Sequence, residues 1–325
     1  MEESKMYKTS DLVLDVNQNY DPEKLPLQEW DRYLDILVNG RQFQKEAIQN
    51  SIIFLASRLY RNTRHLIEEN WKDSKKFEIK SRFTNLADYQ KQLQLPSKLS
   101  ATIDLATGTG KSYVIYGIAQ IMLGLGLVDR VLVLCPSLTI EDGLIEKFTG
   151  LSADSQLVNA IPVNAKWKNP SIKSADVTIK EGDICVENIH AVYETTGSSI
   201  KVSFADNGRR TLVLNDEAHH IYNKFEGRDK ATKSIKKWKE FILNPDFNFK
   251  YSLGFTGTAY IEDEYFNDVI YRYSLRQAVD DKMVKMVDYV SKDDDLIIDI
   301  KFQKIYENHY QNTLNYRLVK PLTIL

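Results

Sequence analysis

The sequence has few cysteines, no long apolar run and no marked excess of charge of one sign. Its two cysteines, Cys135 and Cys185, each lie inside an apolar run, which favours buried reduced thiols over a disulfide scaffold or a zinc site. No apolar run approaches the roughly 18–20 residues that a membrane-spanning helix needs. The charged start, MEESKMYKTS, also lacks the apolar core of a secretory signal. The sequence therefore predicts a cytoplasmic protein with no membrane segment.

The overall composition is that of a folded, globular protein. Hydrophobic residues make up 43% of the chain and charged residues 27%, which argues against disorder. The length of 325 residues allows about two domains, or one large domain with appendages. The formal net charge is −2, so the protein as a whole is not a basic nucleic-acid binder. A local groove of lysine and arginine can still neutralise phosphates, so nucleic acid is not excluded as a partner.

Short β-like runs alternate with helical segments through the middle of the chain. Several of these runs are apolar at consecutive positions, which is typical of strands buried on both faces. The expected strands are residues 101–106, 131–136, 183–189, 211–216 and 251–257. This alternation predicts an α/β fold with a mainly parallel sheet covered by helices. Before it, a helical pattern covers residues 41–71 and a polar, helical stretch follows to about residue 94.

The segment LATGTGKS, residues 105–112, has the properties of a phosphate-binding loop. It follows an expected strand and precedes an apolar helical run, as such a loop requires. Its glycines allow the backbone N–H groups to face phosphate oxygens, Lys111 adds a positive charge and Ser112 offers a hydroxyl to Mg²⁺. The general pattern has glycine where this chain has Leu105. The predicted ATP-binding residues are Thr107, Gly108, Thr109, Gly110, Lys111 and Ser112.

An acidic pair follows a later strand, in TLVLNDEAHH. Asp216 and Glu217 emerge at the carboxyl end of an apolar run. Beside a phosphate loop, the first acid is suited to the magnesium shell and the second to activating a water molecule. The expected catalytic residues are therefore Lys111, Asp216 and Glu217, and the expected cofactors are ATP and Mg²⁺.

The segments LATGTGKS, NDEAH and FTGTA, in this order, resemble motifs I, II and III of superfamily-2 DEAD/DEAH-type helicases and translocases. The residues of these motifs look most like those of the ATPase (Res) subunit of type III restriction enzymes, and the resemblance covers roughly residues 40–290. It implies a RecA-like P-loop lobe and a nucleic-acid partner, namely double-stranded DNA if the parent is a restriction enzyme. It also implies a methyltransferase subunit as a possible further partner.

The resemblance implies further site residues. His219, Thr256, Gly257 and Thr258 would couple the state of the γ-phosphate to domain movement. Arg41 and Gln44 resemble the Q-motif, in which a glutamine reads adenine; the alternative for Gln44 is an ordinary exposed helix residue. The Q-motif lies far from the phosphate loop, so we expect an inserted helical segment between them, over residues 60–95.

Two segments of the sequence are candidates for contact with nucleic acid. Ser137 and Thr139 stand where the family contacts the nucleic-acid backbone, but either residue is also suited to capping a helix. Lys230, Lys233 and Lys237 share a helical spacing, which suits a solvated face or, as the less favoured alternative, a surface facing a duplex.

We expect three parts, with boundaries 1–98, 99–285 and 286–325. The first is the N-terminal segment, the second the RecA-like lobe, and the third a linker with the first strand of a second lobe, at residues 321–325. The arginine finger of such motors comes from the second lobe, so the sequence predicts slow hydrolysis by this chain alone. The alternatives are a DNA-repair, phage-defence or RNA helicase motor, or a nucleotide-gated interaction module.

Overall fold

The computed structural model describes six ranges of the chain. These are residues 12–73, 75–190, 198–219, 238–261, 264–285 and 298–315. The chain divides into two compact units, Met1–Val284 and Lys285–Leu325. In the second unit the described element is the helix α13, Ile298–Asn315.

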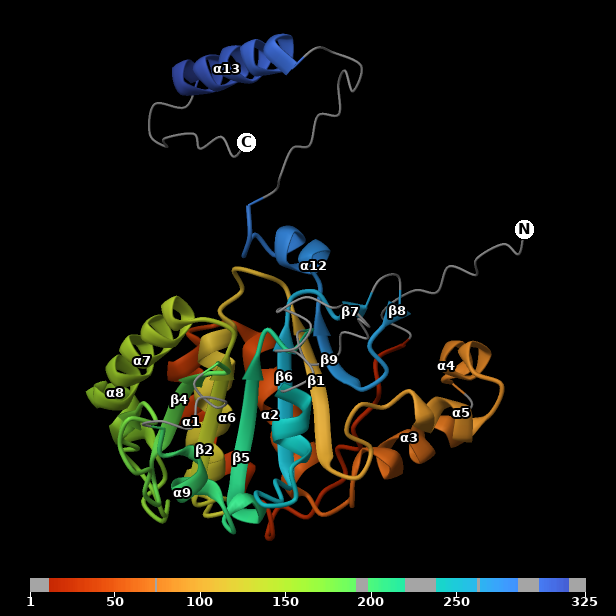
Figure 1. Ribbon diagram of the computed structural model, residues 1–325, viewed down its shortest axis with the longest axis vertical. Helices are drawn as coiled ribbons and strands as arrows, with labels where there is room; N and C mark the ends of the chain where they lie inside the picture. Colours follow the sequence, from red (N-terminus) through yellow and green to blue (C-terminus); the bar gives the residue numbers. More distant parts are fainter. Residues whose placement is uncertain are drawn as a thin grey trace. The chain divides into compact units, whose positions relative to one another are not determined.

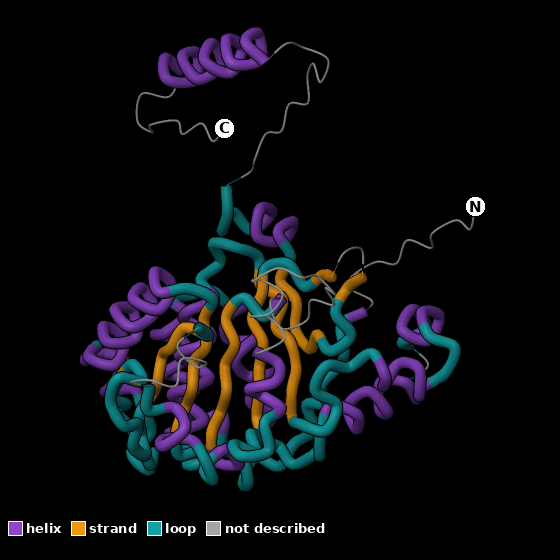
Figure 2. The backbone as a smooth tube through the Cα atoms, viewed as in Figure 1, coloured by secondary structure: helices purple, strands orange, loops and turns teal. Residues whose placement is uncertain are grey.

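The first unit is built on a seven-stranded sheet in which every pairing is parallel (Figures 1 and 2). The strand order is β3-β4-β2-β5-β6-β1-β9. The strands are β1 Leu99–Leu105, β2 Arg130–Cys135, β3 Ile172–Lys173, β4 Ile184–Asn188, β5 Thr211–Asp216, β6 Tyr251–Thr256 and β9 Val269–Tyr273. The predicted parallel sheet is confirmed, because β1, β2, β4, β5 and β6 are buried along nearly their whole length, as their apolar runs indicated.

The first unit also contains ten α-helices among its described residues, several of which lie against the sheet (Figure 1). They are α1 Asp31–Val38, α2 Gln42–Ala56, α3 Thr63–Lys72, α4 Phe77–Arg82, α5 Leu86–Lys91, α6 Lys111–Gly124, α7 Leu138–Ala153, α8 Ser155–Ala160, α9 Ile200–Phe204 and α12 Leu275–Asp280, with 3-10 turns η2 Leu27–Trp30 and η3 Gly208–Arg210. Helix α2 packs against α6 and β9, and α7 packs against β4. No helix in the described part of the chain is both long and apolar enough to cross a membrane.

The helical pattern predicted over residues 41–71 forms two helices instead of one. Helix α2 ends at Ala56, and soon after it Arg58 takes a left-handed backbone conformation with φ 65°. Helix α3 then begins after Asn62, whose side chain accepts a hydrogen bond from the His65 N–H at 3.1 Å. Both helices bury their apolar residues in one core, so the apolar spacing continues from the first helix into the second. The spacing alone therefore does not show the break between them. The polar stretch that follows is helical, in the short pieces α4 and α5.

Two features of the sheet were not predicted. Strand β9 pairs with β1 and forms one edge of the sheet. A short antiparallel hairpin, β7 Tyr260–Ile261 with β8 Glu264–Tyr265, precedes it. The strand expected at residues 321–325 and the basic run with Lys230, Lys233 and Lys237 lie outside the described residues.

Candidate nucleotide site

The predicted site residues come from three adjacent strands. In the order β5-β6-β1, parallel strands end at the same edge of the sheet, so the loops after them lie close together (Figure 2). The loop after β5 begins with Glu217, the loop after β6 begins with Gly257, and the loop after β1 is residues 106–110. Open α/β sheets place their ligand sites at this edge.

The loop after β1 has the backbone of an anion cradle. Gly108 and Gly110 adopt left-handed conformations, with φ 83° and 84°, which residues other than glycine rarely adopt. The Thr109 hydroxyl donates to the Ala106 carbonyl at 2.6 Å and closes the turn. Helix α6 begins at Lys111, so the positive end of its dipole lies at this loop. Consecutive turns of this kind ahead of a helix suit phosphate oxygens.

Lys111 contacts both acids of the pair after β5. Its Nζ lies 2.5 Å from Glu217 Oε1 and 3.9 Å from Asp216 Oδ1. The Lys111 and Asp216 side chains are only 13% and 10% exposed, so the charges interact with little screening by water. Burial raises the pKa of Asp216 above its usual value, and the Lys111 charge opposes that rise. The cation is therefore held by carboxylates at the place where a phosphate-binding lysine is needed.

Glu217 has an unusual backbone. Its φ is 52°, in the left-handed region, although it is not a glycine. Its N–H is bonded to Asp216 Oδ1 at 3.1 Å. Such a conformation costs on the order of 1–3 kcal/mol and occurs most often at functional sites. The turn directs two adjacent acids from a buried strand toward one lysine.

The loop after β6 connects the acids with the phosphate loop. His219 Nδ1 lies 3.2 Å from Thr256 Oγ1 and 3.4 Å from Glu217 Oε2. The Thr258 N–H donates to Thr256 Oγ1 at 3.1 Å. A Cβ on Gly257 would lie 2.8 Å from the Thr107 hydroxyl, so glycine is needed for this close approach. The three predicted loops are thus in mutual contact.

Gln44 is fully buried, which excludes the alternative of an ordinary exposed helix residue. Its side-chain N–H group donates to the Thr109 carbonyl at 2.7 Å and lies 3.4 Å from the Gly110 carbonyl. Its Oε1 is buried and has no hydrogen-bond partner among the described residues. Sequence reasoning missed this contact with the phosphate loop. Adenine recognition by Gln44 and by the half-buried Arg41 stays a prediction.

Ser137 caps helix α7. Its hydroxyl accepts a hydrogen bond from the Ile140 N–H at 3.4 Å, whereas Thr139 is exposed in the first turn. The capping role foreseen for one of the two residues therefore belongs to Ser137. Contact of either residue with nucleic acid stays a prediction.

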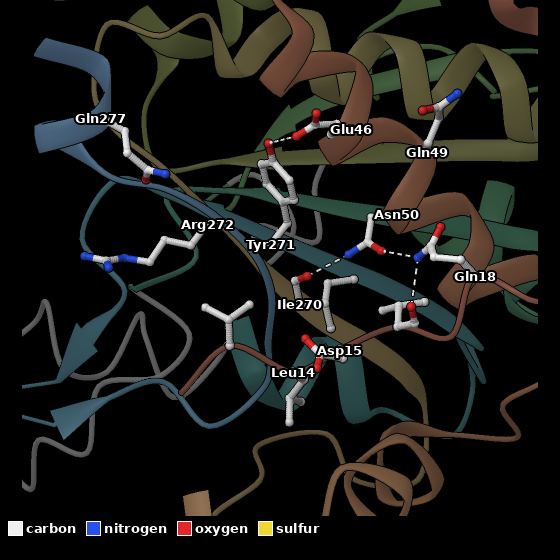
Figure 3. A pocket seen from close by; sticks show the side chains of 12 residues that line it. Leu14, Asp15, Gln18, Glu46, Gln49, Asn50, Ile270, Tyr271, Arg272 and Gln277 are labelled. Carbon is white, nitrogen blue, oxygen red and sulfur yellow. Dashed lines mark hydrogen bonds between the residues drawn. The ribbon is translucent and has the colours of Figure 1, made fainter. Parts of the chain in front are cut away.

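A pocket of about 560 Å³ lies along β9, α2 and residues 13–18 (Figure 3). Tyr271 donates to Glu46 at 3.0 Å, and Asn50 donates to the Ile270 carbonyl at 2.6 Å. Its lining includes neither the phosphate loop nor the acidic pair. The pocket is therefore distinct from the site at the strand ends.

The parallel sheet and the three ordered loops define the ATPase lobe of a superfamily-2 helicase-like protein. The sequence model of one family, described as "Type III restriction enzyme, res subunit" (ResIII), matches residues 37–261, more than half of the chain. The chain belongs to this family.

Two solved structures show weak similarity. The UvsW helicase from bacteriophage T4 has a TM-score of 0.31 and 16% identity, over 57% of this chain and 58% of that one. A nuclease-deletion mutant of the type ISP restriction-modification enzyme LlaGI, solved with a DNA substrate mimic, has a TM-score of 0.36 and 15% identity. It is matched over 66% of this chain and 20% of its own length. No curated protein matches the chain.

Proposed function

We propose that this chain is the N-terminal ATPase lobe of a nucleic-acid-dependent translocase or helicase, and that it binds Mg-ATP at residues 107–112. The observation that carries the proposal is Lys111, held between the phosphate loop and two acids that come from a different strand. A phosphate loop alone suggests binding. The acidic pair beside it adds the groups that hydrolysis requires.

The residues present fit a nucleotide polyphosphate. The loop offers backbone donors, left-handed glycines and a helix start, which together favour an anion. Lys111 donates a hydrogen bond to the Glu217 carboxylate. Phosphate oxygens carry the same sign of charge as that carboxylate, so we expect Lys111 to bind them and Glu217 to be released.

Magnesium would be held by the Ser112 hydroxyl and by Asp216. When bound, the ion neutralises charge on the phosphates. Glu217, freed from Lys111, would orient a water molecule and accept its proton. Burial of Asp216 keeps bulk water from screening its charge.

The remaining predicted residues would serve recognition and coupling. Gln44 and Arg41 would bind adenine. Gln44 would also connect adenine binding with the phosphate loop, through its hydrogen bond to the Thr109 carbonyl. His219 contacts both Glu217 and Thr256. Loss of the bond between Lys111 and Glu217 would therefore change the contacts of the loop after β6.

The parent is proposed to be a restriction-type motor that acts on double-stranded DNA, with a methyltransferase subunit as a possible partner. Family membership supports this reading. Residues 1–98, 99–285 and 286–325 are the proposed parts, the last being the start of a second lobe that would supply an arginine finger. A DNA-repair, phage-defence or RNA helicase motor would use the same site, so the nucleic acid must be tested.

Single-turnover hydrolysis by the wild-type chain and by Glu217→Gln tests the proposed chemistry. We expect Glu217→Gln to bind Mg-ATP but to hydrolyse it about a hundredfold more slowly, because the general base is lost. Glu146→Gln makes the same chemical change at an exposed position of α7 and should hydrolyse normally. Equal rates for wild type and Glu217→Gln would contradict the proposal. Duplex DNA, single-stranded DNA and RNA, each added in turn, would identify the stimulating nucleic acid.

A further inference from the structure

Asp104 is an acidic residue buried in the strand that carries the phosphate loop. It lies two residues before Ala106 and is only 5% exposed. Its carboxylate accepts hydrogen bonds from the Tyr265 hydroxyl at 2.9 Å and from Arg272 Nε at 3.2 Å. Burial raises its pKa, and these two partners oppose that rise. Burying a charge at this depth carries a desolvation penalty that its ion pair can fail to offset.

The sheet register places Asp104 in a polar row that crosses the strand ends. Its partner on β6 is Thr256, and its partner on β9 is Arg272. Register partners in a sheet point to the same face. Thr256 in turn contacts His219, which contacts Glu217. The row therefore runs from the acid of the candidate site to the edge strand.

Tyr265 ties a second element to this row. It lies in β8, in the hairpin that directly follows the segment TGTA. It is almost fully buried, and Arg272 lies 5.7 Å from its ring centre. The Phe266 N–H donates to the Ala259 carbonyl at 2.9 Å, which joins the hairpin to the end of TGTA. Asp104 thus holds both the hairpin and β9 against β1.

Stability alone does not call for this arrangement. Replacing a buried ion pair by apolar residues of similar volume is often neutral or stabilising. The Arg272 side chain is 24% exposed, and Arg272 lines the pocket beside β9 (Figure 3). The network therefore links the phosphate loop with an edge of the molecule.

We propose that Asp104 is a positioning residue that couples the phosphate loop to the β7–β8 hairpin and to β9, through Tyr265 and Arg272. The inference rests on the proposed function, because nucleotide must bind at the loop. Binding takes Lys111 away from Glu217, the contact of Glu217 with His219 changes, and the row Thr256–Asp104–Arg272 passes the change to β8 and β9.

Hydrogen exchange of peptides from β8 and β9 tests the coupling, with Mg-ADP and with a non-hydrolysable Mg-ATP analogue. In the wild type, we expect the analogue to protect these peptides more than ADP does. Asp104→Asn and Tyr265→Phe should bind Mg-ADP as the wild type does but lose this difference. A merely structural role would change both nucleotide states equally.

Two controls separate coupling from stability. Asp129→Asn also removes a buried acid paired with an arginine, and Tyr60→Phe removes the hydroxyl of another buried tyrosine; both should keep the difference. The proposal is overturned if Asp104→Asn and Tyr265→Phe keep the difference, or if the controls lose it to the same extent. A wild-type chain that binds neither nucleotide would instead overturn the proposed function itself.

Discussion

The backbone of Glu217 and the charge of Asp216 both cost free energy. Glu217 is left-handed, and burial raises the pKa of Asp216. A carboxyl whose folded-state pKa is raised destabilises the fold as the pH rises through that pKa, since the charged form is desolvated. The Lys111 charge and the Glu217 N–H bond to Asp216 partly offset these costs. At the scale of residues, the candidate site therefore carries backbone strain and a buried charge that lower stability.

A matched pair of variants measures the strain at Glu217. Glu217→Ala and Glu217→Gly both remove the carboxylate, but only glycine adopts φ 52° without steric cost. We expect the glycine variant to be more stable than the alanine variant by about 1 kcal/mol. Urea unfolding of the two proteins gives this difference. An alanine variant as stable as the glycine variant would show that the backbone is not strained.

Single residues were predicted unevenly. Lys111, Asp216 and Glu217 are evident from sequence, because each is a charge at the end of an apolar strand or the start of a helix. Asp104 is also a charge in an apolar run, but its proposed role depends on contacts with Tyr265 and Arg272, which lie more than 150 positions away in the sequence. The contact of Gln44 with the phosphate loop likewise arises only when α2 packs on α6.

At the scale of elements, Asp129 joins the starts of two neighbouring strands. It precedes β2, and Arg210, which precedes β5, forms a close ion pair with it. Lys166 lies 3.0 Å from the same carboxylate. These partners, Arg210 above all, lower the pKa of Asp129 to about 2. The pair holds β2 and β5 in register at the end of the sheet opposite the candidate site.

The lowered pKa of Asp129 predicts a pH-dependent contribution to stability. The stabilisation is present above the ordinary aspartate pKa of 3.8 and is lost as the pH falls toward 2. Asp129→Asn should therefore lower the free energy of unfolding near neutral pH by about 2 kcal/mol. Denaturant titrations at neutral pH and at about pH 3 should show this deficit shrinking in acid. A deficit of the same size at both pH values would rule out this ion pair as its source.

Elements were predicted where burial leaves a clear pattern. The central strands are apolar on consecutive positions because helices cover both faces of a parallel sheet. The hairpin has only two residues in each strand, and β9 mixes aromatic and charged side chains, so neither gives a clear signal. The break after α2 depends on Arg58 in a left-handed conformation. An arginine in the sequence gives no signal for that conformation.

At the scale of the whole molecule, the order of strands explains how the site forms. Residues that lie 106 positions apart, Lys111 and Glu217, are in contact because the strands that carry them end at one edge of one sheet. Family membership and the geometry of the loops agree with each other. Both indicate the ATPase domain of a helicase-like protein.

Calorimetric titration of Mg-ADP into the protein tests the central claim most directly. Lys111→Ala removes the cation of the phosphate loop, whereas Lys201→Ala removes an exposed lysine of α9. We expect the wild type and Lys201→Ala to bind with equal affinity. Lys111→Ala should bind about tenfold more weakly or worse, because a charge-assisted contact to phosphate is worth roughly 1.5–3 kcal/mol. Equal affinity of Lys111→Ala and the wild type would contradict the assignment of residues 107–112 as the nucleotide site.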